Sequence, residues 1–314
     1  MSQRILITGA SGFAGSHLAE LCDSAGDEVF GLSRSGGRST ETVDLLDAQA
    51  TRMTVAAVKP DVVYHLAALA SVARSWADPG PTLGDNIAAA FNLFEAVRLE
   101  APGAAMVVVS SGELYGPPAS LPVDETAPLR PPNPYAVSKA SIDLLAGFYA
   151  DAYDLRVIRA RSFNHAGPRQ TTVYAVASFA KQVADGLDAG DNPIRVITGA
   201  PTVRRDFTDV RDVVRAYRLL SQLAQPGVYN VCSGRSTSAG EIVALLGDVC
   251  AVAIEHAVDS DRIRPNEIAD VRGSHARLTA ATGWEPQITL EQTLADTVSW
   301  WRSQNAQAGS KPLK

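Results

Sequence analysis

The chain has 314 residues and a mass of 33.1 kDa, with 46% hydrophobic and 20% charged residues, which excludes a disordered chain and allows one large α/β domain or two smaller ones. The net charge of −6 argues against a nucleic-acid partner, although residues 1–150 carry 9 basic and 16 acidic residues and residues 151–314 carry 19 and 18. Three cysteines without metal-ligand spacing, and the lack of a run of about 18 apolar residues, predict a cytoplasmic protein with no disulfide framework, no bound metal and no membrane-spanning helix.

Apolar runs and amphipathic stretches alternate through the first half of the chain. The apolar runs predict strands at 4–8, 28–32, 62–66, 105–110 and 155–160. Helices are predicted between them, at about 13–25, 47–58, 82–100 and 134–151. This alternation indicates βαβ units, and therefore an α/β fold with a Rossmann-type, doubly wound parallel sheet that helices cover on both faces.

The alternation breaks down after about residue 162. Shorter helices are predicted at about 174–188, 210–223 and 239–249, and a last helix ends at Trp300-Trp301. We therefore expect a cofactor-binding domain at 1–161, to which a segment at about 205–235 returns. A smaller C-terminal α/β substrate lobe would occupy most of 162–302, and the polar residues 303–314 would form a flexible tail.

A glycine-rich turn joins the first predicted strand to the first helix. In TGASGFAG, Gly9 permits a tight turn, Gly12 lets a pyrophosphate approach the backbone, and Gly15 allows close packing of helix on strand. The helix N-terminus would hold the phosphates. The cofactor-binding residues predicted here are Gly9, Ser11, Gly12, Phe13, Ala14 and Gly15. A glycine turn without a ligand is the alternative interpretation.

The end of the second strand indicates which nicotinamide cofactor binds. An NAD site usually has an acidic residue there, whereas this chain has Ser33 and Arg34, with Arg38 close behind. These residues would hold a 2′-phosphate, so the sequence favours NADP(H) over NAD(H), unless Arg34 is an ordinary solvated residue. Further cofactor contacts are predicted at Asp44 and Leu45, near the adenine, and at the apolar positions Leu66, Ala67 and Ala68.

Tyr135 and Lys139 lie four residues apart, on one face of a predicted helix. An ammonium group beside a phenol lowers the phenol pKa, which makes the tyrosine a usable proton donor or acceptor at neutral pH. Ser111 ends a buried strand, at the sheet edge where such folds bind ligands, and can contact the same substrate oxygen. A structural tyrosine on an amphipathic helix is the alternative.

These motifs together resemble the extended short-chain dehydrogenase/reductase family, whose members mostly act on nucleotide-sugars. The resemblance rests on the TGxxGxxG turn, on Ser111 before an E-x-Y-G segment and on YxxxK, and it runs from residue 4 to about 302. It implies that Tyr135 donates a proton, that Lys139 tunes Tyr135 and also holds the cofactor, and that Ser111 polarises a carbonyl. A cofactor-sensing protein without turnover would commonly lack the Tyr/Lys pair.

The second half of the chain is most similar to the family members that reduce GDP-linked keto sugars. The segments SFNHAGPRQ, RRDFTDVRD, YNVCSG and TGWEP carry this similarity. It implies NADPH-dependent reduction of the C4 keto group of GDP-4-keto-6-deoxy-D-mannose to GDP-D-rhamnose. The substrate-binding residues would be Ser111, Gly112, Asn164, Lys181, Arg205 and Arg264. For the charged members of this set, surface ion pairs are the alternative.

A sugar 4,6-dehydratase or an epimerase of the same family is the competing enzyme. Family dehydratases carry Thr-Asp-Glu or Thr-Ser-Glu where this chain has Ser111-Gly112-Glu113. Gly112 has no side chain to protonate a leaving hydroxyl, which favours reduction. Glu113 could still act as a base, so it stays among the catalytic candidates, and an epimerase stays open.

The resemblance also implies a homodimer, in which the helices at about 82–100 and 134–151 of two copies form a four-helix bundle. Ile87, Phe91, Phe94 and Val97 recur at helical spacing in the first of these helices. That stripe could equally face the sheet, so dimerisation is an expectation from the family.

Overall fold

The computed structural model describes residues 2–34, 36, 40–263 and 267–309, and the chain consists of two compact units. Unit 1 comprises Met1–Phe163, Val213–Val231 and Gly273–Glu285, and unit 2 comprises Asn164–Asp212, Cys232–Arg272 and Pro286–Lys314. The sequence predicts one returning segment, at about 205–235. In the structure, unit 1 includes a shorter segment, Val213–Val231, and also Gly273–Glu285.

Unit 1 is built on a seven-stranded sheet in which every neighbouring pair is parallel. Its order is β10-β6-β5-β4-β1-β2-β3. The strands are β1 (Arg4–Thr8), β2 (Glu28–Ser33), β3 (Thr40–Thr42), β4 (Val62–His65), β5 (Ala105–Ser111), β6 (Val157–Ser162) and β10 (Gly227–Val231). The predicted α/β fold with a Rossmann-type parallel sheet is confirmed, and the solved structures that share it are given below.

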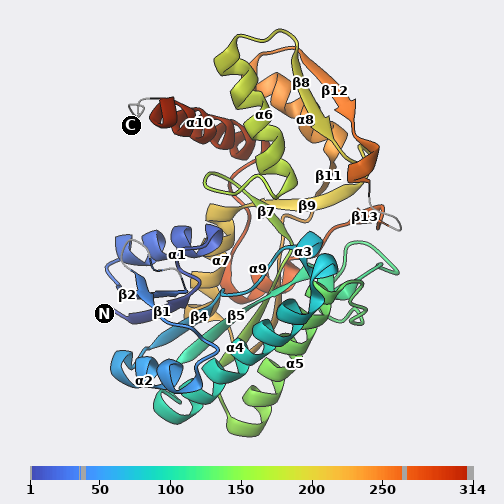
Figure 1. Ribbon diagram of the computed structural model, residues 1–314. Coiled ribbons are helices and arrows are strands. Elements are labelled where there is room, and N and C mark those ends of the chain that lie inside the picture. Colours follow the sequence, from blue (N-terminus) through green and yellow to red (C-terminus); the bar gives the residue numbers. More distant parts are fainter. Residues whose placement is uncertain (1, 35, 37–39, 264–266, 310–314) are drawn as a thin grey trace. The chain divides into compact units, whose positions relative to one another are not determined.

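Helices flank this sheet (Figure 1), and local sequence signals mark where several of them begin. They are α1 (Phe13–Ser24), α2 (Ala48–Val58), α3 (Val72–Ala77), α4 (Pro79–Glu100), η1 (Gly112–Tyr115), α5 (Pro134–Tyr153), α7 (Val210–Leu223) and α9 (Ala276–Thr282). A proline, whose missing N–H costs nothing at that position, opens both α4 and α5. Asp47 caps α2, because its carboxylate accepts the Ala50 N–H at 2.9 Å.

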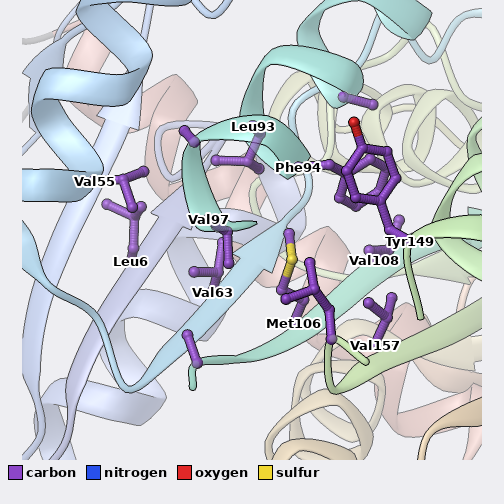
Figure 2. Close-up of a cluster of buried hydrophobic side chains, with 14 of the residues drawn as sticks. Leu6, Val55, Val63, Leu93, Phe94, Val97, Met106, Val108, Tyr149 and Val157 are labelled. Atoms are coloured by element: carbon purple, nitrogen blue, oxygen red, sulfur yellow. The ribbon is translucent and has the colours of Figure 1, made fainter. Parts of the chain in front are cut away.

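One hydrophobic core of unit 1 lies between the sheet and helices α2, α4 and α5 (Figure 2). Alternate strand residues point to this face, and they pack against three helical stripes. The buried members include Leu6, Val63, Met106, Val108 and Val157 from the strands and Val55, Leu93, Phe94, Val97 and Tyr149 from the helices. Of the stripe that the sequence left undecided, Phe94 and Val97 are therefore buried against the sheet, whereas Phe91 is exposed.

Unit 2 has two small sheets with helices around them. Its strands are β7 (Asn164–Ala166), β8 (Ile194–Thr198), β9 (Arg204–Asp209), β11 (Ser236–Ser238), β12 (Ile254–Val258) and β13 (Asp270–Val271). Strand β9 pairs with β7, β11 and β13, and β8 pairs with β12. The helical elements are α6 (Ala175–Ala189), α8 (Ala239–Cys250), η2 (Ser260–Arg262) and α10 (Leu290–Gly309), and side chains of α6, α8 and α10 form the core with β8.

The last helix continues beyond the point where the sequence predicts a flexible tail. Helix α10 extends to Gly309, so residues 303–309 are helical in the structure. Polar contacts explain the difference: Arg302 Nε donates to Asp188 at 2.8 Å, and Asn305 donates to Asp185 and Asp188, each at 2.9 Å. These contacts tie the end of α10 to α6.

Within the part of the chain that the structure describes, none of the helices combines the length and the apolar character that crossing a membrane requires.

Candidate active site

The glycine-rich turn has the geometry that the sequence predicts for it. Gly9 has a φ of +74°, and a Cβ on it would lie 2.8 Å from the backbone nitrogen of Ala67. A Cβ on Gly15 would lie 2.1 Å from the Gly9 carbonyl oxygen, so α1 reaches the turn only because position 15 is glycine. Gly12 is the N-cap of α1 and has no side chain with which to cap it. The helix dipole and the backbone of this turn therefore fit a cofactor diphosphate.

The loop after β2 holds the residues predicted to select the cofactor. Ser33 is buried, and its hydroxyl donates to the Gly36 carbonyl at 2.9 Å. Arg34 is exposed, so its guanidinium is available to a 2′-phosphate. Arg38 lies outside the described residues. The Ser33 hydroxyl already donates its proton within the loop. Of the described candidates in this segment, Arg34 is the one whose side chain is exposed to a ligand.

The adenine-side candidates lie in a second loop. Asp44 is exposed, and its carboxylate accepts the Leu46 N–H at 3.0 Å. Leu45 is buried, and Asn92 of α4 donates to its carbonyl at 2.8 Å. The loop is thus held in place by its own turn and by α4.

The segment after β4 runs alongside the glycine turn. The Ala67 N–H donates to the Thr8 hydroxyl at 3.3 Å, and that hydroxyl also bonds His65 Nδ1 at 2.9 Å. Burial, together with the charge of Lys139, lowers the pKa of His65 to about 3, so the imidazole is neutral. Leu66, Ala67 and Ala68 are partly buried beside these contacts, where the sequence expects cofactor contacts.

Asn86 of α4 joins this segment to α5. Its Oδ1 accepts the Leu69 N–H at 2.7 Å, and its Nδ2 donates to the Ser138 hydroxyl at 3.1 Å. Ser138 in turn donates to the carbonyl oxygen of Tyr135 at 2.8 Å. One buried amide therefore joins the segment after β4 to the turn of α5 that carries Tyr135.

Tyr135 and Lys139 lie in the first two turns of α5, as the spacing predicts. Tyr135 is half-buried, whereas Lys139 is 3% exposed. Lys139 Nζ donates to the Val109 carbonyl at 2.8 Å, which points the ammonium at β5. Burial lowers the pKa of Lys139 from 10.5 to about 8. The ammonium is therefore still charged at neutral pH, and a phenolate beside it would be stabilised.

Ser111 and Glu113 lie where β5 passes into η1. The Ser111 hydroxyl oxygen accepts the Glu113 N–H at 3.2 Å and so caps η1. Asn133, the N-cap of α5, donates from Nδ2 to Glu113 Oε2 at 3.4 Å. Hydrogen bonds thus connect both residues to the start of the helix that carries Tyr135 and Lys139.

The ring of Phe163 occupies the space beside Gly112. A Cβ built on Gly112 would lie 2.9 Å from two ring carbons of Phe163, which is closer than such atoms approach. Phe163 is 5% exposed, and its backbone N–H donates to the Val231 carbonyl at 2.9 Å. Because the Phe163 ring is buried, it cannot easily move aside, and a larger residue at position 112 would clash with it.

The remaining substrate candidates belong to unit 2. Asn164 is exposed on β7. Lys181 forms an ion pair with Asp185, one turn away, at 2.6 Å. Arg205 donates to the Ile268 carbonyl at 2.7 Å. Arg264 lies outside the described residues. Lys181 and Arg205 thus have intramolecular partners, and the roles predicted for all four stay predictions.

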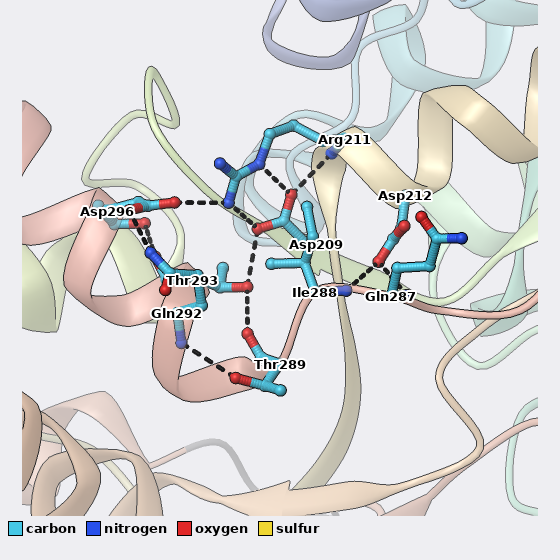
Figure 3. Close-up of polar contacts among 10 residues, drawn as sticks. Asp209, Arg211, Asp212, Gln287, Ile288, Thr289, Gln292, Thr293 and Asp296 are labelled. Carbon is cyan, nitrogen blue, oxygen red and sulfur yellow. Dashed lines mark hydrogen bonds and ion pairs between the residues drawn. The ribbon is translucent and has the colours of Figure 1, made fainter.

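The acidic residues of RRDFTDVRD hold unit 2 together (Figure 3). Asp209 accepts from Arg211 and from the hydroxyl of Thr293, at 2.8 and 2.7 Å. Asp212 accepts the backbone N–H groups of Gln287 and Ile288, each at 2.8 Å. Both carboxylates are buried, so this segment fixes the chain that leads into α10.

Three residues at the site escape the sequence analysis: Asn86, Asn133 and Phe163. Asn133 precedes a proline at the start of a helix, which is an N-cap signal that could have identified its capping role. The other two contact residues about 50 positions away along the chain, and nothing in the local sequence indicates these contacts. Among the residues that the structure describes, no group of three or more His, Cys, Asp or Glu side chains could hold a metal ion.

Comparison with known proteins agrees with this geometry. A family model described as GDP-mannose 4,6 dehydratase matches residues 6–297. The chain is 39% identical to a GDP-6-deoxy-D-mannose reductase of Pseudomonas aeruginosa, over 96% of this chain and 98% of that protein. It is 32% identical to a UDP-glucose 4-epimerase of Mycolicibacterium smegmatis, over 96% and 99%. The solved structure of RMD from Pseudomonas aeruginosa complexed with NADPH matches with a TM-score of 0.86 and 36% identity, over 96% and 100% of the two chains.

Proposed function

This chain belongs to the GDP-mannose 4,6-dehydratase family of extended short-chain dehydrogenases/reductases, and on that premise we propose that it is an NADPH-dependent reductase of a GDP-linked keto sugar. The substrate is GDP-4-keto-6-deoxy-D-mannose, and the product is GDP-D-rhamnose. The 39% identity to a GDP-6-deoxy-D-mannose reductase over nearly the full length of both chains supports this choice within the family.

The contact between Gly112 and Phe163 is the observation that supports reduction rather than dehydration. A 4,6-dehydratase removes the C5 proton and expels the C6 hydroxyl, which needs an acid beside the catalytic tyrosine. At position 112 this chain has no side chain, and the Phe163 ring fills the space that one would take. Reduction of a ketone needs no such acid. The absence of a side chain at position 112 is therefore compatible with a reductase and unfavourable for a dehydratase.

The residues of unit 1 supply the proton and the polar contacts for this reaction. When bound, NADPH provides the hydride that forms the new C4–H bond and is itself oxidised to NADP⁺. Tyr135 donates its phenolic proton to the C4 oxygen, and the Lys139 ammonium stabilises the phenolate that remains. Ser111 donates a hydrogen bond to the same oxygen and so polarises the C=O bond. One hydride and one proton turn the ketone into the alcohol.

The fit of the cofactor site is supported by the glycine turn and by the loop after β2. The glycine N-cap and the dipole of α1 suit a diphosphate, and exposed Arg34 suits the 2′-phosphate that distinguishes NADPH from NADH. The bound NADPH in the matching solved structure agrees with that preference. An epimerase would instead have to return the hydride to the sugar, and the 32% identity to an epimerase keeps this as the second candidate.

The homodimer is a further part of the proposal, and exposed apolar side chains support it. Phe91 on α4 is 48% exposed, and Leu144 and Phe148 on α5 are 63% and 54% exposed. The two helices pack side by side (Figure 1), and we refer to the exposed apolar residues on both of them as the apolar face. A second copy of the same face would bury it in a four-helix bundle. A cytoplasmic location stays a prediction from the sequence.

Two incubations test the reaction. The protein is mixed with NADPH and GDP-4-keto-6-deoxy-D-mannose, and separately with NADP⁺ and GDP-mannose. We expect absorbance at 340 nm to fall only in the first mixture, with NMR identifying GDP-D-rhamnose rather than its C4 epimer. Formation of a keto sugar from GDP-mannose without net cofactor change would show a dehydratase. Tyr135→Phe serves as the control, because it keeps the ring and removes the proton donor.

A further inference from the structure

The reduction leaves the carboxylate of Glu113 without a chemical task, since it consumes one hydride and one proton and removes no proton from carbon. We propose that Glu113 is a positioning residue that ties Ser111 to the first turn of α5, and so sets the spacing between Ser111 and Tyr135. This inference rests on the proposed function, in which those two residues contact one carbonyl oxygen.

A chain of hydrogen bonds runs through Glu113 from Ser111 to α5. The backbone N–H of Glu113 donates to the Ser111 hydroxyl at 3.2 Å, and its side chain accepts from Asn133 Nδ2 at 3.4 Å. Asn133 then accepts the Ala136 N–H through Oδ1 at 2.8 Å. Tyr135 lies within the turn that this last bond closes. The position of Ser111 is therefore linked to that of Tyr135 through two side chains.

The other end of η1 is tied to the same helix by a buried arginine. Arg161 of β6 donates to the Tyr115 hydroxyl at 3.0 Å, and its other two nitrogens donate to Asp143 of α5 at 2.7 and 3.0 Å. Asp143 lies one turn beyond Lys139. Burial raises the pKa of Tyr115 to about 12, so its hydroxyl keeps its proton and donates to Asn230 at 2.7 Å.

These two attachments hold η1 and α5 as one body around the reacting groups. Tyr115, Asp143 and Arg161 are each at most 5% exposed, so water does not compete for their hydrogen bonds. The Glu113–Asn133 bond is the longer and more accessible of the two attachments, and it is nearer to Ser111. Loss of this bond should therefore disturb Ser111 while leaving the fold intact.

The test separates a hydrogen-bond acceptor from an acid or base at position 113. Glu113→Gln keeps an oxygen that can accept from Asn133 but cannot exchange a proton at neutral pH, whereas Glu113→Ala removes the acceptor. We expect kcat for the keto sugar within about threefold of wild type for Glu113→Gln and a fall of up to about 100-fold for Glu113→Ala, because a small misplacement of a reacting group has such an effect. KM for NADPH should stay unchanged in both.

A variant of Asn133 provides the matched partner. Asn133→Ser keeps an oxygen that can cap α5 but has no amide to reach Glu113. We expect it to lower kcat in the same direction as Glu113→Ala. The double variant Glu113→Ala/Asn133→Ser should be no slower than Glu113→Ala alone, because both changes break one bond. Thermal unfolding should show that each variant melts within a few degrees of wild type.

Two outcomes overturn the inference. If Glu113→Gln loses as much kcat as Glu113→Ala, the carboxylate takes part in proton transfer. If the losses of Glu113→Ala and Asn133→Ser multiply in the double variant, the two residues act independently. Failure of the wild-type protein to oxidise NADPH with the keto sugar would be a different result, because that would refute the proposed function itself.

Discussion

Lys139 is a charged side chain that the fold holds almost entirely out of water. Burial lowers its pKa from 10.5 to about 8, so the folded protein releases this proton at lower pH than the unfolded chain does. Between about pH 8 and 10.5 the unfolded chain binds one proton more, and the free energy of unfolding therefore rises with pH. Below pH 8 the buried ammonium costs about 3 kcal/mol. At neutral pH, burial of Lys139 therefore lowers the free energy of unfolding.

Replacement of Lys139 should therefore separate stability from activity. At pH 7 we expect Lys139→Met to melt at the same temperature as wild type or higher, because the lost bond to the Val109 carbonyl is worth only about 1 kcal/mol. Its kcat should fall by at least about 100-fold, since Tyr135 loses the cation that stabilises its phenolate. Differential scanning calorimetry and an NADPH oxidation assay measure the two effects. The exposed Lys59→Met is the control, and a melting temperature of Lys139→Met well below wild type would contradict the argument.

Arg34 should account for much of the preference for NADPH. Arg34→Ala would remove the proposed charge-assisted contact to the 2′-phosphate, and such contacts are worth about 1.5–3 kcal/mol. We expect KM for NADPH to rise by about 10- to 100-fold and KM for NADH to change little. Steady-state kinetics with the two cofactors provides the measurement. An equal rise for both cofactors would place Arg34 away from the phosphate.

The sequence is informative about residues whose partners lie nearby in the chain. Tyr135 and Lys139 are recognisable because a helix brings residues four apart onto one face. Phe163 is not, because it meets Gly112 only through the pairing of β5 with β6. The role of Asn86 cannot be predicted from the sequence either, because its contact with Ser138 forms only when α4 packs on α5. The residues of the candidate site that the sequence misses are those that join separate elements.

At the scale of elements, the junction between β1 and α1 depends on one glycine. A Cβ on Gly15 would lie 2.1 Å from the Gly9 carbonyl oxygen, and a backbone atom cannot move aside as a flexible side chain can. The start of α1 would have to shift away from the turn that we propose binds the cofactor diphosphate. The packing of this helix on its strand and the affinity for the cofactor are therefore coupled.

Gly15→Ala should weaken both properties together. We expect the free energy of unfolding to fall by about 1–3 kcal/mol, as for other overpacked positions, and NADPH to bind at least about tenfold more weakly. Gly103→Ala is the matched control, because a Cβ there would meet no atom within 4 Å. Chemical denaturation and NADPH fluorescence titration measure the two effects. Unchanged NADPH binding in Gly15→Ala would contradict the coupling.

The elements that the sequence predicts well are the long ones with clear periodicity. The five predicted strands and four long helices of the first half all form, within about three residues at each end. The sequence analysis predicts no strand at β3 or β13, which lie at sheet edges and carry no apolar pattern. It also predicts none of β7 to β12, which follow the point where the alternation breaks down, and β10 among them belongs to the seven-stranded sheet. The extension of α10 is missed because its polar residues are held by acidic residues of α6, which lie over a hundred positions earlier.

At the scale of the whole molecule, the apolar face of α4 and α5 should control assembly. Leu144→Glu and Phe148→Glu each place a charge in the proposed interface between two copies. We expect sedimentation velocity to change from a dimer in wild type to a monomer in the double variant. Leu223→Glu on α7 is the control, because this leucine is 55% exposed and lies on a different helix. A wild-type monomer would refute the proposed dimer.

The three separate stretches of unit 1 have a consequence for how the protein is made. The ribosome completes Met1–Phe163 first, but β10, which covers the free edge of β6, follows more than sixty residues later. Until then the nascent sheet exposes unpaired backbone groups along an apolar strand, which is a template for aggregation. A fragment that ends at Phe163 should therefore be poorly soluble, and the full chain should depend on chaperones during translation until residue 231 has emerged.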